Sequence, residues 1–298
     1  MSKTSLESGY GSNSDDFIPE PNVQRIRQDQ MRLQNDFEIG KVLMNSANGR
    51  IYTGRVVKTQ EQVILKQIPR VTCHSWTKFQ GHLVPSEIAY HFQAAANDSD
   101  DVIIRPITWL EKRSSFVLVM EYAENTIDLF DLSQKYGPVN QEAACIIFRQ
   151  IVAMLKTLDR SGICHRDIKD ENIVINLNTL QVKLIDFGCA TKTRNGVVTD
   201  FSGTPEFYPP EFWSEKTYTQ NGLSMWSCGI VLYILLNGRL PYDNVSELQF
   251  YCVEHDLSVD KLPEHPRNIL YKMLQRSNNT RLALPELERL VSSWESSL

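Results

Sequence analysis

Three polar motifs follow one another in the second half of the 298-residue chain, and their order constrains the fold more than any other feature. They read HRDIKDEN, IDFG and GTPEFYPPE, at 165–172, 185–188 and 203–211. Each motif alone could form an ordinary solvated turn. Together they place carboxylates, a carboxamide and a lysine within roughly fifty residues, a combination that could hold a phosphate and a divalent cation at once. The rest of the chain decides between these two interpretations.

Length and composition are those of an ordinary soluble globular protein. A chain with 42% hydrophobic and 22% charged residues can build one large domain or two lobes around a real core. The net charge of −5 gives no electrostatic case for nucleic acid or an anionic membrane, and it leaves room for a basic partner. The apolar run at 228–236 is too short to cross a bilayer and predicts a buried helix.

The N-terminus and the cysteines bear on where the chain functions. The first residues, MSKTSLESGYGSNSDDF, lack the apolar segment of a secretory signal. The six cysteines are scattered and form no CxxC pair, which predicts reduced thiols in a cytoplasmic or nuclear protein. We therefore expect no membrane partner and no nucleic-acid partner, and we expect the protein to act as a monomer.

Hydrophobic periodicity divides the chain into a strand-rich and a helix-rich part. Residues 1–34 are poor in apolar groups and predict a disordered tail, which could include a short helix over 23–33. A β-rich lobe over 35–121, a helical lobe over 122–292 and a short tail over 293–298 follow. This is an α+β plan, in which the cleft between the lobes is a natural ligand site. Strands are expected at 37–44, 49–57, 62–68, 101–111 and 114–122, and helices at 84–96, 140–160, 223–237, 245–255, 265–275 and 284–294.

Two charged residues upstream of the motifs belong to the same pattern. Lys66 lies late in a predicted strand, and Glu87 follows twenty-one residues later in a predicted helix. Such a pair could hold a point charge on phosphate oxygens. Asp167 and Asn172 lie five residues apart in the first motif, and Asp186 in the second is followed by Phe and a flexible Gly. A carboxylate at a strand end before such a loop suits a divalent-metal ligand.

With these residues in this order, the chain resembles a eukaryotic protein kinase of the Ser/Thr type, and within that superfamily it is most similar to the Pim kinases. The likeness runs from about Phe37 to Leu290 and implies the bilobal, α+β protein kinase fold. Pim-like details are TDF-GT, PPEFW where most kinases have APE, a WSCGI helix with Ser224 in place of the usual Asp, and a hinge, EYAENTIDLFD, one residue longer than usual. The resemblance implies ATP-dependent phosphorylation of protein serines or threonines, with Mg²⁺ as cofactor.

The resemblance also gives each charged residue a role in phosphoryl transfer, a reaction that needs alignment and charge neutralisation more than covalent help. Lys66, held by Glu87, would grip the α- and β-phosphates of ATP. Asn172 and Asp186 would bind Mg²⁺. Asp167 would orient the substrate hydroxyl and accept its proton.

Further roles in the motifs follow from the same resemblance. Lys169 would neutralise the γ-phosphoryl group and marks the Ser/Thr type. Thr204 would bond to both Asp167 and Lys169. Glu211 and Arg281 would form a buried ion pair with a structural role in the large lobe.

The expected nucleotide site departs from the family pattern. The glycine-rich loop, LGxGxxGxVY in most kinases, reads LMNSANGRIY at 43–52, so Met44 and Ser46 replace two glycines. Ile64 stands where a small Ala packs on adenine, and Val174 removes one carbon from the opposite wall. These changes predict a shifted and weakened adenine site. The residues expected around the nucleotide are Leu43, Met44, Gly49, Ile51, Ile64, Lys66, Met120, Glu121, Ala123, Val174 and Asp186.

Two other positions also differ from the family. Ala123 occupies the place of a Pim proline in the hinge, and its N–H allows a second hydrogen bond to adenine. His91, four residues after Glu87, occupies a position that is usually apolar in the hydrophobic spine linking the lobes. A buried neutral imidazole is expected there.

Acidic residues around the first motif bear on the protein substrate. They match the acidic surface with which the Pim kinases, which are basophilic, read upstream arginines. Because Ile234 and Arg239 replace two further acids, the pattern predicts a preference for a nearby upstream arginine and a weaker demand for distant ones. The same carboxylates could instead form a solvated face. The residues expected to face the substrate are Asp128, Asp131, Asp170, Glu171 and Thr204.

The sequence leaves two alternatives for how the activation segment is held and two for whether the protein is an active kinase. The activation segment, 186–211, contains possible phosphorylation sites, among them Thr199 and Ser202, but Asp200 could instead pair with Arg166 and hold the segment without phosphate. The complete set of charged residues favours an active ATP–Mg²⁺ kinase. The altered glycine-rich loop and adenine wall favour a pseudokinase or scaffold with weakened nucleotide binding.

Overall fold

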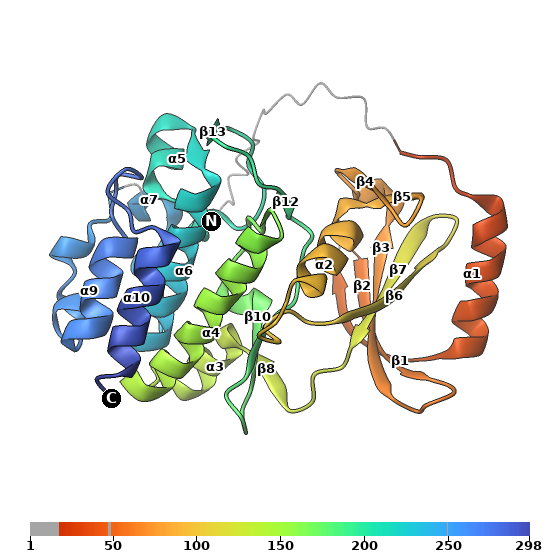
Figure 1. Ribbon diagram of the computed structural model, residues 1–298, viewed down its shortest axis with the longest axis horizontal. Helices are drawn as coiled ribbons and strands as arrows, with labels where there is room; N and C mark the ends of the chain where they lie inside the picture. Colours follow the sequence, from red (N-terminus) through yellow and green to blue (C-terminus); the bar gives the residue numbers. More distant parts are fainter. Residues whose placement is uncertain (1–17, 47–48, 249) are drawn as a thin grey trace, which may run out of the picture.

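The computed structural model describes residues 18–46, 49–248 and 250–298 and shows two lobes along the long axis of the molecule (Figure 1). Strands gather at one end and helices at the other. This arrangement confirms the α+β class and the order of the lobes that the sequence predicted. None of the helices in the described residues combines the length and the apolarity that a bilayer span requires.

The strand-rich lobe is built on a five-stranded antiparallel sheet in the order β1-β2-β3-β7-β6. Successive residues of a strand point to opposite faces, so the sheet separates two apolar clusters. In β3, Val63 and Leu65 pack in one cluster, whereas Ile64 and Ile68 pack in the other. Lys66 lies between Ile64 and Ile68 in this alternation and therefore shares their face. The strands are β1 Phe37–Ser46, β2 Gly49–Val56, β3 Gln62–Pro69, β6 Pro106–Glu111 and β7 Ser115–Glu121.

Helix α2, Ser86–Ala96, covers the face of the sheet that carries Lys66 (Figure 1). A hairpin of β4, Trp76–Phe79, and β5, His82–Pro85, precedes the helix. The sequence predicted only a helix at 84–96 in this region. Strands of four residues are too short to give a periodic pattern, so the hairpin was not predicted.

A helix near the N-terminus confirms the short helix that the sequence allowed over 23–33 and corrects the prediction of disorder for this part of the tail. Helix α1, Val23–Asp36, stands at the outer end of the strand-rich lobe (Figure 1). Its Asp29 is buried and accepts a hydrogen bond from the backbone N–H of Glu111 in β6, at 2.8 Å. The polar composition suggested solvation, but these charges bond to the edge of the sheet instead. Residues 1–17 lie outside the described part of the chain.

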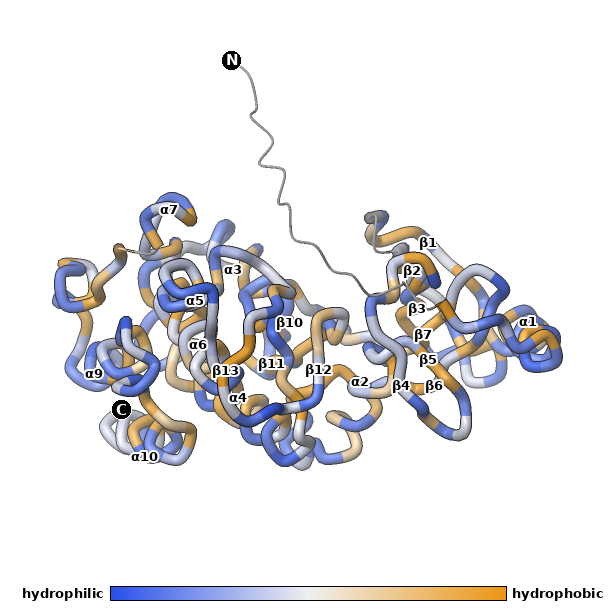
Figure 2. Tube along the Cα trace, turned by 90° about the horizontal axis from the view of Figure 1, so that it is seen from above, coloured by the Kyte–Doolittle hydropathy of each residue, from blue (hydrophilic) through white to orange (hydrophobic). Residues whose placement is uncertain are grey.

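The helix-rich lobe surrounds a large apolar core. Helix α6, Gln220–Asn237, is buried along most of its length, which confirms the buried helix predicted from the run at 228–236. Figure 2 shows hydrophobic stretches inside both lobes and hydrophilic stretches at the outer loops. Helix α10 continues to Glu295 and buries Trp294, which corrects the predicted tail at 293–298. The other helices of this lobe are α3 Leu129–Tyr136, α4 Gln141–Arg160, α5 Pro210–Glu215, α7 Val245–Leu248, α8 Leu257–Asp260, α9 Glu264–Met273 and α10 Leu284–Glu295.

Short strand pairs fix the loops that carry the three motifs. One three-stranded sheet, in the order β11-β10-β8, lies beside the first two motifs, and two further strand pairs hold residues 191–192 and 197–198 within the activation segment. Leu184 of β11 also bridges Ile103, which leads toward the sheet of the other lobe. The motif loops are therefore pinned from both lobes. These strands are β8 Thr126–Asp128, β9 Ile163–Cys164, β10 Ile173–Asn176, β11 Val182–Leu184, β12 Thr191–Lys192, β13 Val197–Val198 and β14 Tyr218–Thr219, with β12 paired to β9 and β13 to β14.

Candidate active site

Lys66 joins the two lobes at the site. Its Nζ lies 2.5 Å from Glu87 Oε1 of α2 and 2.9 Å from Asp186 Oδ1 of the second motif. The alternation of β3 turns Lys66 toward α2, and Glu87 lies in the first turn of that helix. The structure thus brings together the strand lysine, the helix glutamate and the loop aspartate that the sequence singled out.

Lys66 and Asp186 each stabilise the charged form of the other. Burial alone would lower the pKa of Lys66, but the carboxylates of Glu87 and Asp186 raise it above its ordinary value. Burial would raise the pKa of Asp186, but Lys66 and the Gly188 N–H, which donates to Asp186 Oδ1 at 2.8 Å, lower it to about 2. Lys66 is therefore cationic and Asp186 anionic at neutral pH. Such a pair can bind phosphate oxygens and a divalent metal side by side.

The first motif forms a hydrogen-bonded cluster around Asp167. Thr204 Oγ1 donates to Asp167 Oδ1 at 2.7 Å, and Asn172 Nδ2 donates to Asp167 Oδ2 at 2.8 Å. Lys169 Nζ donates to Thr204 Oγ1 at 2.8 Å. Because the Asn172 amide nitrogen faces Asp167, its oxygen is left to accept a cation. We call the set Asp167, Lys169, Asn172, Asp186 and Thr204 the polar floor.

A glycine allows the third motif to approach the first so closely. Gly203 has φ +122°, and a Cβ there would lie 2.5 Å from the Arg166 carbonyl oxygen and 3.1 Å from Asp167 Oδ1. Only a residue without a side chain fits this approach. The GT pair of the third motif therefore serves packing as well as the hydrogen bond of Thr204.

The activation segment is anchored by Arg166. Its guanidinium forms an ion pair with Asp200, and its Nε donates to the Cys189 carbonyl oxygen at 2.7 Å. Tyr218 Oη donates to the Asp200 carbonyl oxygen at 2.8 Å, so the same residue is fixed from a second side. The predicted Arg166–Asp200 pair is present, and it holds the segment with a charge that the chain itself supplies.

The residues predicted to contact adenine lie on adjacent strands. In the sheet register Ile51 is opposite Lys66, and Ile64 is opposite Met120. Ile64 packs against the α2-facing cluster, which contains Met120. Val174 lies in β10, in the strand group of the other lobe. Ile64 and Val174 thus belong to opposite lobes, as the two walls of an adenine slot require.

The segment expected to cover the phosphates, residues 43–51, differs from the polar floor. Leu43 and Met44 expose 56% and 58% of their surface. Gly49 has φ +138°, and a Cβ there would lie 2.0 Å from a carbonyl oxygen of β3. The surviving glycine is therefore required by strand packing itself. The Ser46 side chain and residues 47–48 lie outside the described residues. We call residues 43–51 the phosphate cover.

In the hinge, the Glu121 side chain is held by contacts to both lobes, whereas the backbone N–H of Ala123 can bind a ligand. Glu121 accepts a hydrogen bond from Lys183 Nζ at 2.7 Å and forms an ion pair with Arg105 at 3.6 Å, so its side chain ties the lobes together. The Ala123 carbonyl oxygen accepts a hydrogen bond from Thr126 Oγ1 at 2.8 Å. Within the described chain, the Ala123 N–H donates to no protein acceptor, so it is available to a ligand.

The acidic residues near the polar floor differ in how far they are exposed and in the partners that they bind. Asp128 caps α3 and accepts a hydrogen bond from the Asp131 N–H at 2.7 Å, and Asp131 is exposed. Asp170, expected at the surface, is only 5% exposed because it begins a tight turn beneath α3. Burial, with Glu171 and Asp128 nearby, raises the pKa of Asp170 to about 6. Glu171 is exposed, but it forms an ion pair with Lys169 at 2.7 Å.

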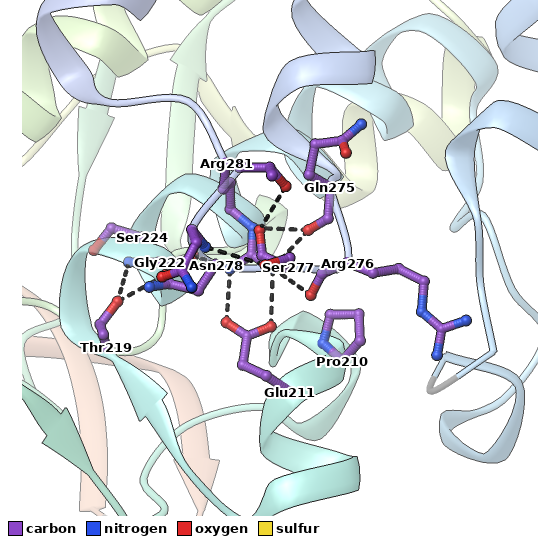
Figure 3. A network of polar contacts seen from close by, with 12 residues as sticks. Pro210, Glu211, Thr219, Gly222, Ser224, Gln275, Arg276, Ser277, Asn278 and Arg281 are labelled. Carbon is purple, nitrogen blue, oxygen red and sulfur yellow. Dashed lines mark hydrogen bonds and ion pairs between the residues drawn. The ribbon is translucent and has the colours of Figure 1, made fainter.

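The third motif ends in the buried ion pair that the sequence predicted. The Nη1 and Nη2 atoms of Arg281 donate to Oε1 and Oε2 of Glu211 at 2.7 and 2.9 Å (Figure 3). Arg281 also donates to the carbonyl oxygens of Gly222, at 3.0 Å, and Gln275, at 2.7 Å. The pair therefore joins the end of the activation segment to α6 and to the loop before α10.

An aromatic stack beside the site was not predicted from the sequence. The ring of Phe187 is stacked on His91, with centroids 4.6 Å apart, and meets His165 edge-on at 5.1 Å. Both imidazoles are buried, and burial lowers the pKa of each, that of His91 to about 4. The expected neutral imidazole at position 91 is thus present. That three sequence-distant rings would meet was not predicted, because spacing does not reveal stacking.

A two-lobed fold with a lysine, a glutamate and an aspartate meeting between sheet and motif loops defines a protein kinase. The comparisons agree, since the family model of the protein kinase domain matches residues 37–291. The chain belongs to the protein kinase family.

Individual relatives place it with the Ser/Thr kinases. The serine/threonine-protein kinase prk-2 of Caenorhabditis elegans is 34% identical over 226 residues, which cover 75% of this chain and 49% of that protein. The serine/threonine-protein kinase pim-2 of Danio rerio is 30% identical over 234 residues, covering 76% and 75%. The serine/threonine-protein kinase PSK2 of Saccharomyces cerevisiae is 28% identical over 280 residues, covering 91% and 25%. The matched part thus spans about half of the nematode relative.

The polar floor fits the ATP and Mg²⁺ that protein kinases generally use. Asp186 offers a carboxylate whose side chain is 43% exposed, and Asn172 offers a carboxamide oxygen. No group of three or more His, Cys, Asp or Glu side chains in the described residues forms a complete metal site. A cation held by these two residues takes its other ligands from phosphate and water, which is the usual coordination of Mg²⁺.

Proposed function

We propose that this protein transfers the γ-phosphoryl group of Mg-ATP to serine or threonine residues of proteins. One observation carries the proposal: charged side chains from both lobes converge. Lys66 Nζ lies 2.9 Å from Asp186 Oδ1, and the remaining residues of the polar floor bond around Asp167. Phosphoryl transfer depends mainly on such positioning and on charge neutralisation.

Each residue of the site then has a task. Bound Mg-ATP supplies the transferable phosphoryl group and a metal that neutralises charge on the phosphates. Lys66, fixed by Glu87, binds phosphate oxygens. Asn172 and Asp186 hold the metal. Asp167 orients the acceptor hydroxyl and takes its proton.

Lys169 completes the substrate side of the floor. Its Nζ lies 3.8 Å from Asp167 Oδ2 and donates to Thr204 Oγ1. Burial alone would lower the pKa of Lys169, but Glu171 and Asp167 raise it, so the side chain is cationic at neutral pH. A cation at this place stabilises the negative charge of the group in transit.

The acceptor is proposed to follow a nearby basic residue. Glu171 pairs with Lys169 of the polar floor, and Asp128 and Asp131 lie at the start of α3. Asp170, near Glu171 and Asp128, adds negative charge above about pH 6. A peptide library with one upstream position varied at a time tests this proposal. We expect arginine close to the acceptor to raise kcat/KM, and a library without basic preference would refute it.

Activity is proposed not to need phosphorylation of the activation segment. The Arg166–Asp200 ion pair and the Tyr218 hydrogen bond already fix the segment. The double variant Thr199→Ala, Ser202→Ala should therefore keep activity within about twofold of wild type, since surface substitutions away from such contacts have small effects. A loss of activity that a phosphatase treatment of wild type reproduces would show that phosphate is required.

A scaffold with weakened nucleotide binding is the second candidate, favoured by the exposed Met44 and by Ile64 in the adenine wall. Incubation of the purified protein with radiolabelled ATP, Mg²⁺ and an arginine-containing peptide separates the two. We expect label in the peptide. Label in neither peptide nor protein, combined with binding of ATP, would favour the scaffold.

Two expectations from the sequence stay proposals. We propose that the protein acts as a monomer, which agrees with a site whose charged residues all come from one chain. A cytoplasmic or nuclear location rests on the scattered cysteines, all six of which are free.

A further inference from the structure

The loop between α9 and α10 contacts the start of α6 through two side chains. Arg281 Nη1 donates to the Gly222 carbonyl oxygen at 3.0 Å, and Asn278 Oδ1 accepts a hydrogen bond from Thr219 Oγ1 at 2.8 Å (Figure 3). Arg281 also forms the ion pair with Glu211 that the sequence predicted. The contact made by Asn278 was not predicted, so it calls for an explanation of its own.

Asn278 sets the direction of the Thr219 hydroxyl. Thr219 is the N-cap of α6, and its Oγ1 accepts a hydrogen bond from the Gly222 N–H at 3.0 Å. A hydroxyl has a single proton to donate, and this proton goes to Asn278 Oδ1. Loss of the Asn278 acceptor would therefore remove the contact that orients the helix cap.

The first turn of α6 leaves room for this contact. A Cβ at position 222 would lie 1.9 Å from Asn278 Oδ1 and 2.8 Å from Thr219 Oγ1. Glycine is among the least favourable residues in a helix, and Gly222 fits here because a residue without a side chain admits Asn278. A hydrogen bond and a close approach thus independently indicate that this contact is a specific feature of the fold.

The residue that Asn278 holds also belongs to the strand that fixes the activation segment. Thr219 and Tyr218 form β14, which pairs with residues 197–198 of that segment. Tyr218 Oη also donates to the Asp200 carbonyl oxygen at 2.8 Å. A contact that fixes β14 therefore fixes residues 197–200, which lead directly into the third motif.

We propose that Asn278 is a positioning residue, which holds β14 and, through it, residues 197–200 of the activation segment in the arrangement that a peptide substrate requires. The functional consequence rests on the proposed phosphoryl transfer to proteins, whereas the structural consequence does not. Because Arg281 of the same loop holds Glu211 at the end of the segment, this loop anchors the activation segment at two places.

Two substitutions of Asn278 separate the hydrogen bond from the shape of the loop. Asn278→Ala removes the acceptor, whereas Asn278→Asp keeps an oxygen at the place of Oδ1. We expect Asn278→Ala to raise the KM for an arginine-containing peptide about fivefold to tenfold, as the loss of one hydrogen bond implies, with the KM for ATP unchanged. Asn278→Asp should keep the KM for peptide within about twofold of wild type, as one preserved hydrogen bond implies.

Thr219→Val tests the same bond from its other end. Valine keeps the branched shape of threonine but has no hydroxyl, so this variant loses both the helix cap and the contact to Asn278. If Asn278 acts through Thr219, adding Asn278→Ala to Thr219→Val should change the KM for peptide by less than about twofold. Losses that multiply in the double variant, or a rise in the KM for ATP as large as that for peptide, would overturn the proposal.

Thr280→Ala is the matched control in the same loop. Thr280 is exposed, and its Oγ1 donates to the Ser277 carbonyl oxygen at 3.1 Å, a bond within the loop itself. The control should leave both KM values unchanged. Equal losses in Thr280→Ala and Asn278→Ala would show a general sensitivity of the loop and would also overturn the proposal.

Amide hydrogen exchange without nucleotide tests the role of Asn278 apart from catalysis. Exchange over residues 197–200 should be about fivefold to tenfold faster in Asn278→Ala than in wild type, and unchanged in Thr280→Ala. Equal exchange in wild type and Asn278→Ala would refute the positioning role. If exchange differs as expected but the wild-type protein transfers no phosphate to peptide, the proposed function is refuted and the positioning role stands.

Discussion

The polar floor and the phosphate cover, which are expected to hold the same nucleotide, are built in opposite ways. In the floor, every side chain is held by a hydrogen bond or an ion pair, for example Asp167 between Thr204 and Asn172. In the cover, Leu43 and Met44 are more than half exposed. The floor keeps the residues expected of its family, whereas the cover has lost two of three glycines.

The difference teaches which functions depend on side-chain identity. A floor residue acts through its own charged or hydrogen-bonding group, so a substitution changes both the chemistry and the contacts of its bonded neighbours. The cover would act through backbone N–H groups, which every residue except proline possesses. Strand pairing still demands Gly49, because a Cβ there would meet the β3 backbone at 2.0 Å. We therefore expect function to tolerate change in the cover and not in the floor.

The largest expected effect is the difference in activity between a variant with one substitution in the polar floor and a variant with one substitution in the phosphate cover. Asp167→Asn should lower kcat about 10³-fold, because an amide cannot accept the proton and presents an N–H to the donors Thr204 and Asn172. Met44→Gly should change kcat/KM for ATP by less than about threefold. Steady-state phosphate transfer measures both. Comparable losses in the two variants would break the distinction between floor and cover.

The second prediction concerns the buried ion pair between Glu211, at the end of the activation segment, and Arg281. Glu211→Ala should lower the free energy of unfolding by about 3–5 kcal/mol, because it leaves the Arg281 guanidinium, whose side chain is 1% exposed, without its carboxylate. Arg105, whose side chain is 65% exposed where it pairs with Glu121 at 3.6 Å, offers the control, and Arg105→Ala should cost less than about 1 kcal/mol. Urea unfolding gives both values. A cost below 1 kcal/mol for Glu211→Ala would show that the pair does not stabilise the folded protein.

The third prediction is a dependence of stability on pH. The folded protein lowers the pKa of His91 from 6.5 to about 4. Between these values the unfolded chain binds a proton that the folded chain does not, so the free energy of unfolding falls as the pH drops, by at most about 3 kcal/mol. His91→Phe should lack this part of the acid loss. Parallel urea unfolding curves of both proteins at pH 7 and pH 4.5 test it, and identical losses would contradict the assignment.

The smallest effect is expected in the adenine wall. Ile64→Ala removes three carbons from a slot that usually holds alanine, and should lower the Kd for ATP about threefold. Ile68→Ala is the control, because Ile68 lies on the same strand and face but packs only in the sheet core. It should cost stability without tightening ATP. A Kd for Ile64→Ala equal to that of wild type would count against crowding.

The sequence predicted the parts of the molecule that depend on local pattern or on charged residues in fixed order. Alternating apolar residues predicted the central sheet, and the run at 228–236 predicted the buried α6. The Lys66–Glu87 pair, the Thr204 bonds and the Glu211–Arg281 pair were also predicted, because the resemblance to kinases carries them residue by residue.

What the sequence did not predict depends on contacts between distant segments. Asp29 looks solvated in the sequence, yet it is buried against Glu111. Asp170 was expected at the surface, but the turn beneath α3 buries it. The stack of His91, Phe187 and His165 joins three separate segments. Tertiary packing determines whether these side chains are buried and which groups they contact, and neither composition nor spacing predicts it.

A double-mutant cycle of Lys66→Met and Asp186→Asn in a phosphate-transfer assay tests most directly that both lobes build one site. If the two residues act on the same Mg-ATP, each single variant should lose at least about 10²-fold in kcat/KM. The kcat/KM of the double variant should then lie within about threefold of that of the less active single variant. Losses that multiply in the double variant, or a wild type no more active than Asp186→Asn, would contradict the account.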